Sequence, residues 1–76
     1  MTAEEWIEAF AEAANGSPPD ERETGKLLKL AAVAAHSSER IAAPLACWMA
    51  GREGLELDDA IAIAERVGAD GEGAGS

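Results

Sequence analysis

The 76-residue sequence has few of the residues from which catalytic and metal sites are built: one histidine, one cysteine and no tyrosine. A single cysteine cannot form an internal disulfide, and the spacing of a cysteine metal cluster is absent. A glycine-rich phosphate loop between a strand and a helix is absent too. One histidine among surface carboxylates cannot assemble paired acid and base groups. We therefore expect a protein that is not an enzyme, and the sequence identifies no cofactor.

Basic residues are also scarce, since six of them face fifteen acidic residues and leave a net charge of −9. Nucleic acids and anionic membrane surfaces are bound through Lys and Arg, so neither is expected as a partner. The sequence has no apolar run of about 18 residues, as a membrane span requires. The first ten residues do not resemble a signal peptide. We expect a cytoplasmic protein whose partner is another protein with a basic patch.

Large apolar side chains are few, because alanine supplies eighteen of the hydrophobic residues. A core of this size rarely contributes more than about 3–5 kcal/mol of net stability. Further stability can come from close packing of alanine faces between helices, or from burial of a second apolar face against a partner. A homodimer, and with it a self-associating structural role, is therefore among the expected states.

The first of four helical patterns covers residues 3–14. Thr2 and Glu5 have the spacing of a capping box, in which each side chain binds the other residue's backbone N–H. Trp6 and Phe10 recur at helical spacing after it. Asn15-Gly16 then supplies a stop, because glycine readily adopts the left-handed conformation of a helix C-terminus.

Two further helices are predicted on either side of a polar junction. One begins between Asp20 and Thr24 and fades near Ser37-Ser38. The other has Pro44 in its first turn, where the missing proline N–H costs nothing. Its residues 45–50 are apolar on every side, which predicts a buried helix, part of it facing a second subunit.

The last predicted helix starts after Asp58 as N-cap and stops at Gly68. Residues 1–68 would form a single domain, and residues 69–76 a disordered tail with nothing to bury. The predicted fold is all-α, a compact four-helix bundle with short loops and a disordered C-terminal tail.

The candidate binding surface is the junction that contains His36, Arg40 and Pro44, with Trp6 and Trp48 near an interface or in the core. On a continuing helix, His36 and Arg40 would share a face and could clamp an anion, since Arg offers a rigid fork of donors. The alternative, which the sequence favours, is that both cations stabilise the C-terminal end of the helix. Cys47 is expected to pack as a small hydrophobe.

The segment 27–51 resembles a small, mostly actinobacterial domain family of unknown function. Members of that family occur alone, or fused to or encoded beside molybdenum-cofactor guanylyltransferases and formate-dehydrogenase maturation proteins. The matching positions are Ala35, His36, Arg40, Ala43, Pro44, Leu45 and Gly51. Ile41 stands where the family has proline, and Ala46 where it has threonine. The resemblance implies a helical accessory or adaptor domain that binds a partner protein or an anionic, molybdopterin-type cofactor.

Acyl carrier proteins are a second resemblance, in size, acidity and number of helices. Ser38 lies near the position of the serine that carries phosphopantetheine. The defining Asp-Ser-Leu motif is missing, since Ser38 follows Ser37 and precedes Glu39. An acyl-carrier-like protein modified at Ser38 therefore remains the alternative to the accessory domain.

Overall fold

The computed structural model describes residues 1–75, with side chains through residue 69, and contains four α-helices in its described part. They are α1 (Ala3–Ala13), α2 (Glu21–Ser37), α3 (Ala42–Arg52) and α4 (Leu57–Gly75). The predicted all-α class and the four helices are confirmed. Among the described residues, none of the helices combines the length and the apolar character that crossing a membrane requires.

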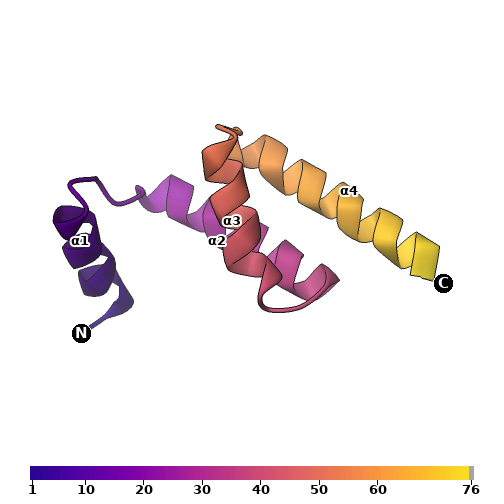
Figure 1. Cartoon of the computed structure of the whole chain (residues 1–76), viewed down its shortest axis with the longest axis horizontal. Coiled ribbons are helices and arrows are strands. Elements are labelled where there is room, and N and C mark those ends of the chain that lie inside the picture. Colours follow the sequence, from indigo (N-terminus) through magenta and orange to yellow (C-terminus); the bar gives the residue numbers. More distant parts are fainter. Residues whose placement is uncertain (76) are drawn as a thin grey trace.

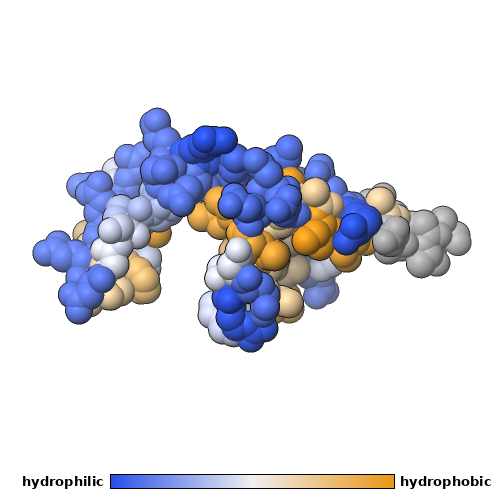
Figure 2. Space-filling view, turned by 90° about the horizontal axis from the view of Figure 1, so that it is seen from above, coloured by the Kyte–Doolittle hydropathy of each residue, from blue (hydrophilic) through white to orange (hydrophobic). Residues whose placement is uncertain are grey.

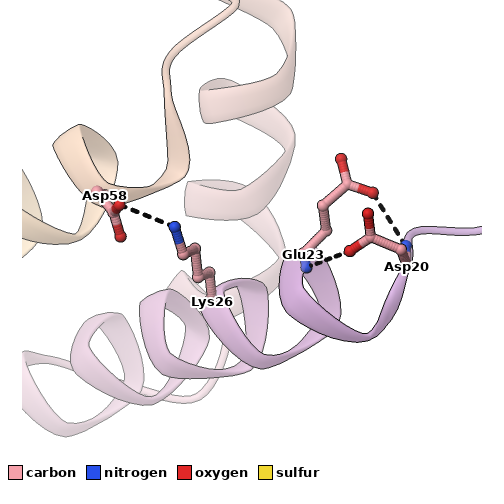
Figure 3. Close-up of polar contacts among 4 residues, drawn as sticks. All are labelled: Asp20, Glu23, Lys26 and Asp58. Atoms are coloured by element: carbon pink, nitrogen blue, oxygen red, sulfur yellow. Dashed lines mark hydrogen bonds and ion pairs between the residues drawn. The ribbon is translucent and has the colours of Figure 1, made fainter.

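Capping boxes set the start of the first two helices. Thr2 Oγ1 accepts from the backbone N–H of Glu5, and Glu5 Oε1 accepts from the N–H of Thr2, as predicted. Asp20 and Glu23 form a second box at the start of α2, with distances of 2.8 and 2.9 Å (Figure 3). Both boxes satisfy N–H groups that the first turn leaves without helical partners.

Helices α3 and α4 both pack against α2, which runs through the middle of the molecule (Figure 1). The core between them consists of Leu30, Ala50, Ala60 and Ile61. Lys26 Nζ on α2 lies 2.8 Å from Asp58 Oδ2 in the first turn of α4 (Figure 3). The predicted capping role of Asp58 is therefore wrong, because α4 begins one residue earlier, at Leu57.

Helix α1 stands apart from this three-helix core (Figure 1) and makes no extensive packing contact with another described helix. The connection to α2 contains Pro18 and Pro19, whose rings fix φ and favour an extended chain. The molecule measures 45 × 25 × 18 Å as a result.

Helix α4 does not stop at Gly68, as the sequence predicts, but continues to Gly75. Gly68 serves close packing instead, because a Cβ at this position would lie 2.5 Å from Ser37 Oγ on α2. The predicted boundary between a domain over 1–68 and a disordered tail over 69–76 stays a prediction. Ser76 lies outside the described residues.

Helix α3 is not buried on every side, although its sequence predicts that it is. Leu45, Trp48 and Met49 remain 58%, 60% and 52% exposed. The reason is that α2 covers one side of α3, while no described helix covers the other. Ala50, at 5% exposure, is the one buried residue of this helix.

Candidate functional site

The exposed side of α3 is a continuous apolar surface. Ile41, Leu45, Trp48 and Met49, named here the α3 stripe, follow one another at helical spacing. All four are more than half exposed. Exposed large apolar residues arranged in one row mark interaction surfaces more often than scattered ones do.

Helix α1 carries a second apolar row, Trp6, Ile7 and Phe10, named here the α1 stripe. The rings of Trp6 and Phe10 stack with centroids 5.2 Å apart and an angle of 16° between their planes. Trp6 is nevertheless 53% exposed and Phe10 58% exposed. This stacking fixes two large aromatic side chains in place before any partner arrives, which lowers the entropic cost of binding.

The two sides of the molecule differ in polarity. In Figure 2, hydrophobic residues lie on the side of α1, at the left, that faces the notch and at the head of the notch, while hydrophilic residues form the opposite edge. The chain exposes 5944 Å². A compact monomer of 7.8 kDa is expected to expose about 4,400 Å². This excess counts polar and apolar atoms together, and its apolar part includes the exposed side chains of the α1 and α3 stripes.

Arg52 lies at the C-terminal end of the α3 stripe, beside Trp48. Its guanidinium carbon lies 4.4 Å from the centroid of the Trp48 ring, and its Nε donates to Glu53 Oε2 at 3.2 Å. Arg52 is not among the site residues predicted from the sequence, although its spacing of four residues from Trp48 puts both on one face of a helix. Such cation–π pairs are common at protein interfaces, where aromatic residues and Arg are enriched.

The predicted site residues are distributed along the chain as follows. His36 lies in the last turn of α2, which ends at Ser37, and Arg40 follows in the connection to α3. The two therefore do not share the face of a continuing helix. Pro44 lies in the first turn of α3, one turn before Trp48, as predicted. Trp6 belongs to α1, which stands apart from the part of the chain that carries the other four predicted site residues.

His36 and Arg40 also differ in their surroundings. Both are exposed, and the two ion pairs found among the described side chains involve neither of them. His36 lines a shallow hollow between α2 and α4, together with Lys29 and Glu65. Arg40 does not line this hollow, so the two predicted anion-binding residues do not converge on one pocket.

Cys47 lies on the side of α3 that faces α2. Its Sγ is 3.8 Å from the Leu27 carbonyl oxygen, and burial raises the pKa of the thiol. A protonated, partly buried thiol packs as a small apolar group. Within residues 1–69, no three His, Cys, Asp or Glu side chains are grouped as metal ligands would be.

Ser38 lies at the C-terminal end of α2, where its hydroxyl accepts from the backbone N–H of Glu39. The acyl-carrier resemblance places the modified serine at the start of a helix. Helix α3 begins only at Ala42. The acyl-carrier alternative stays a prediction, although Ser38 follows a helix here and the modified serine of the resemblance begins one.

No curated protein and no solved structure matches the chain significantly. A family profile spans residues 1–72, and its family is described as a domain of unknown function. This confirms, at that level, the resemblance seen in residues 27–51. The chain therefore belongs to the family DUF6457, a domain of unknown function.

Proposed function

We propose that the chain is a non-catalytic accessory domain that acts by binding protein through the α1 and α3 stripes. The observation that carries this proposal is the exposure of both tryptophans, Trp6 and Trp48, on helices that have a free apolar side. Tryptophan is the residue most enriched among those that dominate binding energy at interfaces. Its exposure on both helices costs solubility without contributing to the core.

The resemblance to domains found with molybdenum-cofactor proteins suggests a setting for this activity. In that setting, the domain would assist a cofactor-inserting or enzyme-maturation protein. An anionic, molybdopterin-type ligand is the second candidate, supported by Lys29 and His36 beside the hollow between α2 and α4. Glu65 at the same hollow and the net charge of −9 oppose an anion there.

Photo-crosslinking in the cells of origin tests the protein-binding proposal. Benzoylphenylalanine replaces Met49 on the α3 stripe, or Glu21 on the polar start of α2 as a matched exposed control. We expect at least about tenfold more polypeptide adducts at position 49 than at position 21, because only the first position lies inside an apolar surface. Equal adduct levels at both positions would contradict the proposal.

The anionic-ligand candidate has a separate test. Arg40→Ala tests the anion-binding role that the sequence predicts, and it should leave helicity intact because the side chain is exposed and lies outside the helices. Since Arg40 does not line the hollow, weaker binding in this variant would place the ligand at the junction between α2 and α3 instead. Lys29→Ala and His36→Ala test the hollow in the same titration with a pterin phosphate. Loss of folding in Arg40→Ala would instead assign the arginine a structural role.

A further inference from the structure

We infer that the partner seated on these stripes is a second copy of this chain, with α1 of each protomer packed on the α3 stripe of the other. This inference rests on the proposed function, because it names the occupant of the same surface. Three observations support it: the amount of uncovered surface, the pairing of two apolar rows within one chain, and the distribution of charge around them.

The uncovered area fits a dimer. The 5944 Å² exposed by the chain exceeds the value for a compact monomer of this mass by about 1,500 Å². A standard interface buries about 800 Å² on each partner, and obligate homodimers bury more. The excess counts polar as well as apolar surface, and two chains that each covered about half of it would form an interface of standard size.

The two stripes have matching forms. Each is one apolar row along a helix of 11 residues. Two helices of this kind can pack with the ridges of one in the grooves of the other. Because one chain carries both rows on separated helices, a two-fold axis would bury all four rows in two identical contacts.

The charges around the two stripes favour contact between unlike stripes. Helix α1 carries Glu4, Glu5, Glu8 and Glu12 and no basic residue, so two α1 helices would repel each other. The α3 stripe has Arg40 before its first residue and Arg52 after its last. An acidic α1 therefore suits the α3 stripe of the partner better than another α1.

The contact between Arg52 and Glu53 does not prevent this pairing. Both side chains are more than half exposed, at 55% and 58%. Exposed ion pairs contribute about 0–1 kcal/mol, so a glutamate from the partner can replace Glu53 at little cost.

Sedimentation equilibrium at micromolar concentrations tests the inference. We expect a dimer for the unmodified chain. Trp6→Lys in the α1 stripe and Trp48→Glu in the α3 stripe should each raise the dissociation constant at least about 30-fold, as expected for central interface residues. Leu45→Glu is a second α3 variant. Val67→Glu is the control, because Val67 is an equally exposed apolar residue on α4, outside both stripes.

Mixing the two tryptophan variants tests the geometry. In the proposed dimer, the heterodimer retains one intact contact, between α1 of the Trp48→Glu chain and α3 of the Trp6→Lys chain. The other contact then joins a lysine with a glutamate. The mixture should therefore dimerise although each variant alone does not. If like rows packed together, no intact contact would remain, and the mixture would stay monomeric.

The outcomes separate this inference from the proposed function. Circular dichroism of each variant shows whether the helices persist. A monomeric unmodified chain overturns the second-copy inference, and a monomeric mixture of the two variants overturns the pairing of α1 with the α3 stripe. If crosslinks from position 49 then reach a different protein, the proposed function stands without the dimer. If the chain is monomeric and position 49 yields no adduct, both fail.

Discussion

Leu30 and Leu28 form a matched pair of leucines on α2 with opposite surroundings. Leu30 is 2% exposed and packs with Ala50, Ala60 and Ile61, whereas Leu28 is 66% exposed. Full burial of a leucine side chain contributes about 1.5–3 kcal/mol. Removing it also leaves a cavity, and neighbouring alanines are too short to fill it. We expect Leu30→Ala to lower the free energy of unfolding by about 3–4 kcal/mol.

That loss approaches the whole stability expected of a core of this size, about 3–5 kcal/mol. Leu28→Ala should cost less than about 0.5 kcal/mol, because little apolar area leaves water when α2 folds. Urea unfolding followed by circular dichroism, at one fixed protein concentration, measures both changes. The midpoint of thermal unfolding should fall by about 12–32 °C in Leu30→Ala. Equal losses in the two variants would show that α2 presents a different face to the core.

Three further predictions concern other contacts of α2. Replacing a glycine inside a helix with alanine normally adds roughly 1 kcal/mol of stability. Gly68→Ala should not show this gain, because its Cβ would lie 2.5 Å from Ser37 Oγ. Adding Ser37→Gly should restore that gain in a double-mutant cycle. Cys47 has a raised pKa through burial, so iodoacetamide should modify it at least about tenfold more slowly in the folded than in the urea-unfolded chain. Asp58 has a lowered pKa through its hydrogen bond from Lys26. The stability it contributes is present above the usual aspartate range and lost as the pH falls below about 4. Asp58→Asn should remove that part of the acid dependence, and an unchanged pH profile would contradict it.

The helices could be predicted from the sequence because their signals are local. The Thr2–Glu5 capping box, the stop after α1 and Pro44 in the first turn of α3 each depend on neighbouring residues only. The sequence predicts that Gly16 adopts the left-handed conformation at this stop, whereas in the structure it is Asn15, with a φ of 58°. The Asp20–Glu23 box has the same local signal, an acidic N-cap followed three residues later by glutamate. The predicted start of α2, between Asp20 and Thr24, lies at this box, but the pair itself is not among the predicted caps.

The packing could not be predicted in the same way, because it depends on which helices meet. An apolar stretch such as 45–50 predicts burial but does not state what covers it, and here one side of α3 faces no described helix. Gly68 has the composition of a helix stop, yet it lies at a close contact with Ser37. A glycine at a helix crossing and a glycine after a helix look alike until the neighbouring helix is known.

The connection between α1 and α2 leads to a last prediction about the dimer. The pair Lys26–Asp58 holds the start of α4, and hence the connection after α3, near the first turns of α2. We expect a flexible link to let α1 reach the α3 stripe of the same chain. With Pro18 and Pro19 in place, the link is stiff and directs α1 away.

Replacing both prolines with Ser and Gly would make residues 14–20 a flexible link with an average span of about 15 Å. Such a link gives α1 an effective concentration in the millimolar range at its own α3 stripe. This contact would compete with the partner's α1, so the dissociation constant of the dimer should rise at least about tenfold. Ser17→Ala, which keeps both prolines, is the control. Sedimentation equilibrium measures both variants, and an unchanged constant in the proline variant would show that the stiffness of this link does not decide where α1 packs.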